Sequence, residues 1–188
     1  MWWRWKEPQI ETGRLILRLP RHGDFRGWSA ARAASADYLK PWEPRWSDDH
    51  LSRSAYRARV HWSRKAARDE RAYPFFIFDR ASDAFLGAVT LDNIRRGPAQ
   101  MGTVGYWMNQ SASGQGYMTE ALSALVEWAF RDLGLSRIEA GCLPENEGSK
   151  RVLEGAGFTS EGAARAYLKI DGAWRDHLLF AALSDDRT

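Results

Sequence analysis

The stretch from Val104 to Arg131 constrains the fold most, because two hydrophobic periodicities follow one another within it on either side of a glycine-containing turn. Its first residues alternate at period two, which predicts a strand, and its later residues recur at helical spacing. Between them lies the segment SASGQG at residues 111–116, which has few bulky side chains. The pattern therefore predicts a strand, a tight turn and an amphipathic helix. The alternating positions are Val104, Tyr106 and Met108, and the helical ones are Met118, Ala121, Leu122, Leu125, Val126 and Ala129.

This turn has the properties of a phosphate site. Backbone N–H groups of a glycine turn can approach a ligand closely, and a helix that starts just after it adds the positive end of its dipole. A nucleoside triphosphate loop is excluded because no lysine follows Gly116. A dinucleotide fingerprint is disfavoured because Thr119 takes the place of its third glycine and the stretch lies late in the chain. The remaining alternative is a plain strand, turn and helix in which the glycines only cap the elements.

Length and composition are those of a folded protein. The chain has 188 residues, of which 44% are hydrophobic and 13% aromatic, and this suits one domain with a sizeable core. We expect a single domain over residues 1–188, with its core at about residues 10–183 and a tryptophan-rich extension at residues 1–9. Trp2, Trp3 and Trp5 in that extension are expected to pack on the domain's own surface, with docking onto a partner as the alternative.

The same composition excludes several classes of protein. The first residues, MWWRWKEP, are too short and too charged for a signal peptide, and no apolar run approaches the roughly 18 residues of a membrane span. We therefore expect a cytoplasmic protein without membrane contact. The one cysteine, Cys142, rules out an intramolecular disulfide and a cysteine-based metal site. Because the four histidines also show no ligand spacing, no metal is expected.

The net charge of +3 is unevenly distributed. Residues 14–71 hold 14 Lys or Arg against 7 Asp or Glu, an excess that can steer a protein toward polyanions. In that part, a helix predicted to follow Ser47 or Asp48 carries arginines on one face. This face is either a solvated surface or a contact for a polyanion or an acidic surface. The arginines are Arg53, Arg57, Arg64, Arg68 and Arg71.

A family resemblance is carried by the glycine turn and by segments on both sides of it. The run GQGYMTEAL at residues 114–122, after Gly105-Tyr106-Trp107, resembles the acetyl-CoA loop of the GNAT N-acetyltransferases. Other segments resemble the Rim-type enzymes of that family, which acetylate ribosomal-protein N-termini, and in particular the subgroup that modifies an N-terminal alanine. They are Leu39-Lys40-Pro41-Trp42-Glu43-Pro44, Asn146-x-x-Ser149, Gly157-Phe158 and the run from Tyr167 to His177.

The resemblance spans about residues 10 to 183 and departs from the family at one position. Ser111 stands where the superfamily often has Gln or Arg, three residues before the first loop glycine. We therefore expect the loop amides, rather than a side chain at this position, to hold the pyrophosphate.

The fold implied by the resemblance is α/β (α+β), a single GNAT domain. Its sheet would be mixed and mostly antiparallel, with about seven strands, flanking helices and a fourth strand that splays from the fifth. The periodicities agree with this order of elements. Strands are expected at residues 14–19, 73–78, 85–91, 104–109, 137–143, 158–170 and 174–183, the last two joined across Asp171-Gly172. Helices are expected at residues 24–35, from residue 47 or 48 onward, within residues 117–131 and at residues 145–156.

The resemblance also implies acetyl-CoA as the co-substrate. Unpaired backbone amides near Met108 and Asn109 would face the acetyl carbonyl and the pantetheine arm. Asn146 would bind that arm, with helix capping as its alternative role, and Ser149, one turn further along the same helix, would protonate the departing thiolate. Cys142 is expected to be a small packing residue rather than a covalent acetyl carrier. The expected cofactor residues are Trp107, Met108, Asn109, Ser111, Gly114, Gln115, Gly116, Tyr117, Met118, Asn146 and Ser149.

On the acceptor side a weak general base suffices. An N-terminal α-amine with a pKa near 7.7–8.0 is already roughly a tenth neutral at pH 7, whereas a lysine side chain near 10.4 is almost wholly protonated. A carboxylate acting through water can therefore serve, and the resemblance places Glu43 and Asp176 ahead of Asp92 and Asp171. A salt bridge to a nearby arginine is the alternative role of each. The expected catalytic residues are thus Ser149, Glu43 and Asp176, and the expected acceptor-binding residues are Trp42, Glu43, Tyr167 and Trp174.

These observations together lead us to expect an acyltransferase that moves acetyl from acetyl-CoA directly to the N-terminal α-amine of a protein. The expected acceptor is alanine of a ribosomal protein. A small-amine acetyltransferase, acting on an aminoglycoside or a polyamine, is the alternative within the family. A ribosome- or RNA-binding factor with a vestigial CoA site is the alternative from another class, because of the arginine-rich face. The sequence leaves the oligomeric state open.

Overall fold

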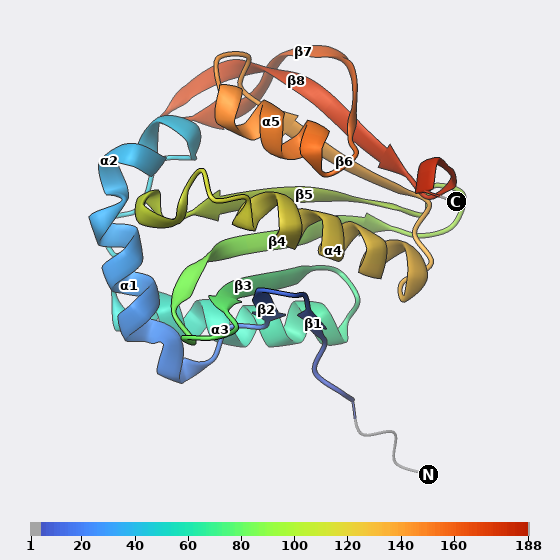
Figure 1. Cartoon of the computed structure of the whole chain (residues 1–188). Coiled ribbons are helices and arrows are strands. Elements are labelled where there is room, and N and C mark those ends of the chain that lie inside the picture. Colours follow the sequence, from blue (N-terminus) through green and yellow to red (C-terminus); the bar gives the residue numbers. More distant parts are fainter. Residues whose placement is uncertain (1–4, 188) are drawn as a thin grey trace.

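The computed structural model describes residues 5–187 and contains one sheet with helices on both of its faces (Figure 1). No helix in this part of the chain is long and apolar enough to cross a membrane. The strands are β1 Gln9–Glu11, β2 Leu15–Arg18, β3 Tyr73–Asp79, β4 Phe85–Arg95, β5 Met101–Met108, β6 Arg137–Cys142, β7 Thr159–Ile170 and β8 Ala173–Leu183. The α-helices are α1 Phe25–Ala34, α2 Ala36–Leu39, α3 Arg53–Arg68, α4 Tyr117–Arg131 and α5 Glu147–Gly155.

The sheet has the strand order β1-β2-β3-β4-β5-β6-β8-β7. Neighbouring strands are antiparallel except β5 and β6, which are parallel. The predicted mixed, mostly antiparallel sheet is therefore confirmed, with eight strands among residues 5–187 rather than about seven. The additional strand is β1, whose 3 residues pair with β2 from Gln9↔Arg18 to Glu11↔Ile16. A strand this short is not recognisable from alternation.

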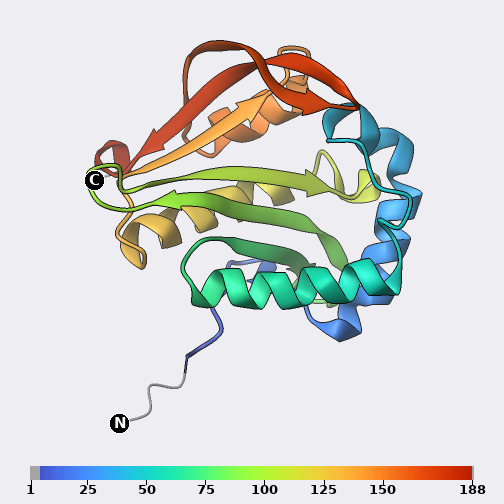
Figure 2. The ribbon, with the colours of Figure 1, turned by 180° about the vertical axis from the view of Figure 1, so that it is seen from behind.

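The two faces of the sheet carry different helices (Figures 1 and 2). On one face α4 buries the apolar stripe that its sequence predicts, and Leu122, Leu125 and Val126 are fully enclosed in the main core. On the other face α1 and α3 enclose a separate apolar cluster around Trp28 and Tyr56. Because α3 packs on β3, it leaves the adjoining part of the sheet, β4 to β8, in view in Figure 2.

The parallel pairing of β5 and β6 is short. Its register runs from Met101↔Arg137 to Val104↔Ala140, and it does not include the last residues of β5. Figure 1 shows β6 leaving β5 beyond this point together with β7 and β8. When β1 is not counted, β5 and β6 are the fourth and fifth strands, so the expected splay is confirmed. The sheet is therefore open in its middle, between two halves that are each continuous.

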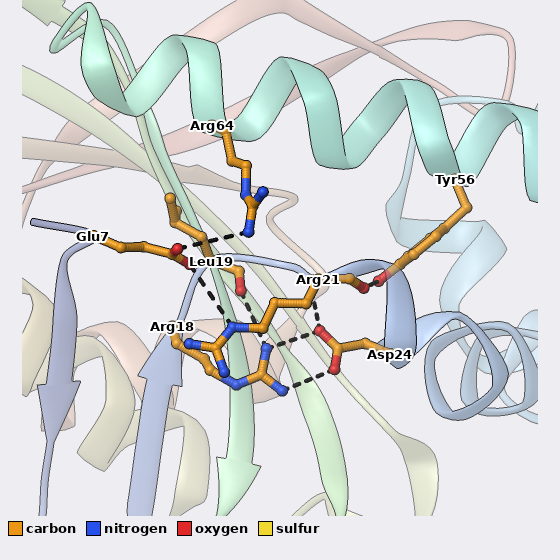
Figure 3. A network of polar contacts seen from close by, with 7 residues as sticks. All are labelled: Glu7, Arg18, Leu19, Arg21, Asp24, Tyr56 and Arg64. Atoms are coloured by element: carbon orange, nitrogen blue, oxygen red, sulfur yellow. Dashed lines mark hydrogen bonds and ion pairs between the residues drawn. The ribbon is translucent and has the colours of Figure 1, made fainter. Parts of the chain in front are cut away.

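A buried ion pair fixes β2 to the segment that leads into α1 (Figure 3). Arg18 donates to both carboxylate oxygens of Asp24 at 2.8 Å, and both side chains are about nine-tenths enclosed. The hydroxyl of Tyr56, on α3, donates to the carbonyl of Arg21 at 2.8 Å. Removing one partner of such a pair is strongly destabilising, because the charge of the other partner stays buried without compensation. The path of the chain from β2 to α1 is thereby tied to α3.

The segment before β1 docks on the domain. Glu7 lies 3.8 Å from Arg64 of α3, as Figure 3 shows, and the Arg68 guanidinium lies 5.0 Å from the ring centre of Trp5. Trp5 also packs against the main core, as expected for a tail that folds onto its own domain. Trp2 and Trp3, for which the same packing is expected, lie outside the described residues.

Candidate active site

A cavity of about 1140 Å³ lies at the gap between β5 and β6 and is lined from both faces of the sheet. Met118, Asn146 and Ser149 line it from the α4 and α5 side, and Arg32 and Glu43 line it from the α1 side. Because one cavity is reached from both faces, two molecules can meet in the gap from opposite directions.

The glycine turn forms an open cradle at one end of this cavity. Gly114 and Gly116 have φ values of +75° and +76°, a region that glycine adopts without strain. A Cβ on Gly114 would meet nothing within 4 Å, and one on Gly116 would meet only the Arg14 guanidinium, at 3.6 Å. Since α4 begins at Tyr117, the first N–H groups of the helix have no intrahelical acceptor. Within residues 5–187 no carbonyl accepts from the amides of residues 114–118, so the cradle fits an anionic pyrophosphate.

Arg14 clamps this turn, and sequence reasoning missed it. Its Nε donates to Glu120 at 2.6 Å, its Nη1 donates to the Gln115 carbonyl at 3.1 Å, and its guanidinium lies 4.5 Å from the ring centre of Tyr117. The Thr12 hydroxyl donates to the other Glu120 oxygen at 2.6 Å. Burial alone would raise the pKa of Glu120, but the hydrogen bonds from Thr12 and Arg14 together lower it. The partners are 106 residues apart, so no local pattern reveals the clamp.

Ser149 lies in the first turn of α5 and is bonded to β5. Its amide donates to the side-chain oxygen of Asn146 at 2.9 Å, so Asn146 caps α5, which is the alternative role that the sequence left open. Its Oγ is 2.7 Å from the hydroxyl of Tyr106, and the Ser149 carbonyl is 3.3 Å from the same hydroxyl, whose single proton can be donated to either oxygen. Burial raises the pKa of Tyr106, so the phenol stays protonated. The sequence shows Tyr106 only as one apolar position of a strand, and its role next to Ser149 was missed.

Cys142 is buried at the end of β6 and lines the same cavity. Burial raises the pKa of its thiol to about 11, so it is protonated at neutral pH. A thiol is a poor nucleophile compared with a thiolate. The expected packing role therefore agrees with the environment of Cys142.

At the end of β5, only one of the two backbone amides expected to be unpaired, those of Met108 and Asn109, faces the gap. The amide of Asn109 is paired, because it donates to the Leu86 carbonyl at 2.8 Å, and its side chain donates to the Phe85 carbonyl at 2.8 Å. Successive amides of a strand point to opposite sides, so the amide of Met108 faces the gap. Met108 thus supplies the unpaired donor that the sequence assigned to both residues.

Glu43 is held by an ion pair on the acceptor side of the gap. Arg32 of α1 donates to its two oxygens at 2.7 and 2.6 Å, and the indole N–H of Trp46 donates at 2.7 Å. The Arg32 guanidinium lies between the rings of Trp46 and Trp107, 4.1 and 4.5 Å from their centres. The side chain of Trp107 is therefore on the acceptor side, not on the cofactor side expected from the sequence. The salt bridge that the sequence left open for Glu43 is present.

Asp176 and Trp174 lie outside the cavity, which corrects two expectations. The exposed carboxylate of Asp176 accepts the amide of Ala166 at 2.8 Å, and Trp174 is 65% exposed. Both face away from the cavity because successive strand residues point to opposite sides of a sheet. Their neighbour His177, which is 2% exposed, lines the cavity instead.

His177 is a candidate proton acceptor that sequence reasoning missed. Its Nδ1 lies 3.0 Å from the carbonyl of Arg175. Since a carbonyl can only accept, Nδ1 carries the proton of the neutral ring, and Nε2 keeps its lone pair. The ring lies beside the gap, with Cδ2 3.7 Å from the Cβ position of Gly141 and the ring centre 5.6 Å from that of Tyr167. The Trp-Arg-Asp-His run at residues 174–177 was recognised as part of the site. The sequence alone did not show which side chains of this run face the cavity.

The remaining expected residues divide between the cavity and the surface. Trp42 and Tyr167 line the cavity, as do Tyr117 and Met118. Ser111 and Gln115 are exposed, and the Gln115 side chain donates to the Ser111 carbonyl at 3.0 Å. The glycine cradle is therefore built from backbone, with Arg14 as the nearby cation.

Asp171 and Asp92 are also distant from the gap. Asp171 is exposed in the turn between β7 and β8, where its amide donates to the Glu43 carbonyl at 2.9 Å. Asp92 pairs with Thr103, and Thr103 lies five positions before Met108 on β5, which corresponds to about 17 Å along a strand. Glu43 is thus the only one of the four carboxylates considered that lies near the gap.

The family model described as acetyltransferase (GNAT) domain matches residues 14–159. A probable N-acetyltransferase of Bacillus subtilis, YjcK, is 38% identical over 155 residues, which cover 82% of this chain and 86% of that protein. The ribosomal protein uS5 alanine N-acetyltransferase of Escherichia coli is 34% identical over 180 residues, covering 96% and 93%. Mycobacterium smegmatis RimJ, solved in complex with CoA-disulfide, has a TM-score of 0.87 and 33% identity, covering 96% of this chain and 88% of that chain. The chain therefore belongs to the GNAT family and is an acetyltransferase.

Proposed function

We propose that the protein transfers acetyl from acetyl-CoA directly to the N-terminal α-amine of a protein, and that this acceptor is an alanine of a ribosomal protein. The observation that carries the proposal is the cavity at the gap between β5 and β6. It joins the glycine turn and Ser149 on one side of the sheet to Glu43 and His177 on the other. The CoA bound in the RimJ structure supports the donor, and the name of the Escherichia coli relative supports the acceptor.

On the donor side, backbone groups and two hydroxyls have distinct roles. The amides of residues 114–118 would hold the pyrophosphate at the start of α4, and the side-chain NH₂ of Asn146 would hold the pantetheine arm. Acetyl-CoA supplies the thioester carbonyl that the amine attacks. The amide of Met108 would donate to the oxygen of that carbonyl as negative charge develops there. Ser149 would give its proton to the departing sulfur, and a hydrogen bond donated by Tyr106 to Ser149 Oγ leaves that proton free.

On the acceptor side, Nε2 of His177 would take the proton that the amine loses. An α-amine is partly neutral at pH 7, so a neutral imidazole is a sufficient base. Glu43, whose charge is balanced by Arg32, would hold the amine or a water through its remaining lone pair and act as a positioning residue. The raised pKa of Cys142 supports direct transfer over a covalent acetyl-enzyme.

The outer surface of α3 is basic and would attract an anionic partner. The helix carries six Lys or Arg and no Asp or Glu. Such a surface would draw the enzyme toward ribosomal RNA while the acceptor N-terminus enters the gap. A cytoplasmic location follows from a ribosomal acceptor.

The glycine cradle can be tested with Gly116→Val. We expect acetyl-CoA affinity to fall about tenfold or more, because a branched side chain would fill the space in which phosphate meets the amides. Isothermal titration calorimetry measures the affinity, and a thermal melt checks the fold. Gly134→Val is the matched control, since Gly134 also has a positive φ, +63°, with nothing near its Cβ position, but lies beyond the far end of α4. Wild-type affinity in a folded Gly116→Val protein would remove the turn from the cofactor site.

The hydroxyl pair should affect turnover rather than binding. We expect Ser149→Ala to lower kcat about 100-fold and Tyr106→Phe to lower it about tenfold, with acetyl-CoA affinity within about threefold of wild type, because the proton is needed only as the thiolate leaves. Since the two hydroxyls act as a unit, the double variant should be no slower than Ser149→Ala alone. Stopped-flow thiol release gives the rates.

Cys142→Ala is the control for this pair and should leave kcat unchanged. Intact-mass analysis of the wild-type enzyme quenched during turnover provides the opposing result. An acetyl group found on Cys142 would show that the transfer is not direct.

The choice between His177 and Asp176 as proton acceptor can be decided by substitution. We expect His177→Gln to lower kcat about 100-fold at pH 7, whereas Asp176→Asn should stay within about threefold of wild type. The deficit of His177→Gln should shrink as the pH rises toward 10, because the amine then loses its proton to water. A deficit that is constant over this range would indicate a structural role instead. A larger loss in Asp176→Asn than in His177→Gln would restore the carboxylate as the base.

The acceptor class can be tested with peptides that begin with Ala or Leu, lysine side-chain peptides and free polyamines. We expect Ala N-termini to be preferred over lysine side chains at pH 7, because the pKa difference is worth about 3.5 kcal/mol in the population of neutral amine. Raising the pH to 10 should erode this preference but leave Ala ahead of Leu, since Trp42 and Tyr167 narrow the acceptor side sterically. Equal rates for Ala and Leu N-termini, or faster acetylation of polyamines, would favour the small-amine alternative.

A further inference from the structure

The cavity extends from the gap along the face of the sheet on which α3 lies. In this direction α3 packs on β3 and α1 packs on β4, and Figure 2 shows no helix in front of β5, β6 and β8. Besides apolar residues such as Pro74, the lining there contains polar and small residues that have no part in the transfer step described above. They are Ser63, Thr90, Asp92, Thr103, Gly105, Arg137, Glu139 and Glu161. We call this part of the cavity the acidic groove.

The strand register orders the floor of the acidic groove. Starting from Trp107 at the gap, the next residue of β5 on this face is Gly105, and the next is Thr103. Gly105 is exposed, and a Cβ on it would meet nothing within 4 Å, so a chain can lie directly on the sheet at this point. Thr103 pairs with Asp92 of β4 on one side and with Glu139 of β6 on the other. Two carboxylates therefore flank the floor, one on each side.

The carboxylates of the acidic groove outnumber its cations. Within residues 5–187 Asp92 has no ion pair, and its Oδ1 accepts only the amide of Asn93, at 2.7 Å. Glu139 accepts from Arg137 at 2.8 Å, and the same guanidinium forks onto Glu161. Glu139 and Glu161 thus share one guanidinium, and Asp92 has no ion pair within the described residues, so carboxylates exceed cations among the groove residues named above.

Two other cations that line the cavity have contacts away from the floor of the acidic groove. Arg32 is bound to Glu43, and Arg59 lies over the ring of Trp28, 5.5 Å from its centre. Lys169 of β7 and Arg151 of α5 also line the cavity, and within the described residues neither forms an ion pair with Asp92 or Glu139. None of these contacts neutralises Asp92 or Glu139.

A second feature of the acidic groove is an unsatisfied hydroxyl. Ser63 is fully buried on α3, and its Oγ has no hydrogen-bond partner within the described residues, although it lines the cavity. A buried polar atom without a partner costs free energy unless a ligand satisfies it. The nearby strand residue Pro74 also lines the cavity and has no N–H to offer. Ser63 is therefore a polar residue of the cavity lining whose hydroxyl no group of the described residues satisfies.

We infer that the acidic groove binds the segment that follows the acceptor's N-terminal residue, in extended form, and selects a cationic side chain within it. The inference rests on the proposed function and deepens it, because it names the chemistry of the acceptor beyond its first residue. Thr103 lies four residues from Trp107, about 13 Å along a strand, and an extended peptide covers that length in about four residues. A side chain at about the third to sixth position of the acceptor therefore reaches Asp92 and Glu139.

A peptide scan tests this inference. The probes are peptides that begin with Ala and contain otherwise neutral residues, with a single Arg, Glu or Ser moved through positions 2 to 8. Arginine is used because it offers no competing amine. We expect kcat/KM to be about fivefold higher for Arg than for Glu at positions 3 to 6, an effect typical of a partly exposed charge pair, and equal for the two at position 8. The preference should shrink as salt is raised from 0.05 to 0.5 M.

Variants of the acidic groove assign the preference to named residues. Asp92→Lys should reverse the order, so that the Glu peptides become the better substrates, and Glu139→Gln should reduce the preference for Arg. Asp132→Asn is the matched control, because Asp132 is an exposed carboxylate that follows α4 and does not line the cavity, and it should leave the preference unchanged. Gly105→Val should raise the KM for every peptide without changing acetyl-CoA affinity, because it obstructs the floor and not the cradle.

The outcomes separate this inference from the proposed function. If Ala peptides are acetylated equally well with Arg or Glu at every position, the acidic groove has no role in selection and the proposed function stands. If no peptide is acetylated but a polyamine is, both fall. If sedimentation shows a dimer that Asp92→Lys dissociates, a second copy of the chain occupies this face, and the inference is overturned.

Discussion

The site depends on the point at which β5 and β6 stop pairing, after Val104↔Ala140. Small residues follow on both strands, Gly105 and Gly141, so no side chain of theirs closes the gap. Two links join its sides instead, one on each face of the sheet. Tyr106 bonds to Ser149 of α5 on one face, and on the other the Glu43 carbonyl accepts the amide of Asp171. The opening thus stays wide enough for two substrates while its rims are held by hydrogen bonds.

The acceptor wall illustrates how charge and aromatic packing fix a loop. Arg32 would be costly to bury alone, but Glu43 balances its charge and the rings of Trp46 and Trp107 pack against its guanidinium. Because Trp107 belongs to β5, the strand that supplies the Met108 amide to the donor side also positions the loop on the acceptor side. A shift of β5 would therefore disturb both halves of the reaction.

The parts of the structure that were predictable from the sequence are those set by local patterns. The stripe of α4 follows from helical spacing, and the hairpin of β7 and β8 follows from Asp171-Gly172, whose residues have positive φ as such a turn requires. The glycine turn before Tyr117 was also recognisable, because its chemistry resides in the backbone of consecutive residues.

The remaining features depend on contacts between distant segments. Arg14 meets Glu120 only after β2 has joined the sheet, and Tyr106 meets Ser149 only after α5 has packed beside β5. Asp176 and His177 are adjacent, so the sequence could place a base in their run, but the choice between them required knowing which face of β8 borders the cavity. Successive residues of a strand point to opposite faces, so one of two neighbouring side chains can be chosen only when the face that borders the cavity is known.

The position of β8 also determines when the enzyme becomes complete during its own synthesis. β8 is the last strand in chain order, yet it lies between β6 and β7. Until the ribosome has released residues up to Leu183, β6 has an unpaired edge, β7 has no neighbour and His177 is missing from the cavity wall. The cradle and α4 can fold before this, since β1 to β5 precede them. The nascent chain thus completes the strands around the glycine turn early, and the strand that carries His177 into the cavity wall is the last of the described strands to be made.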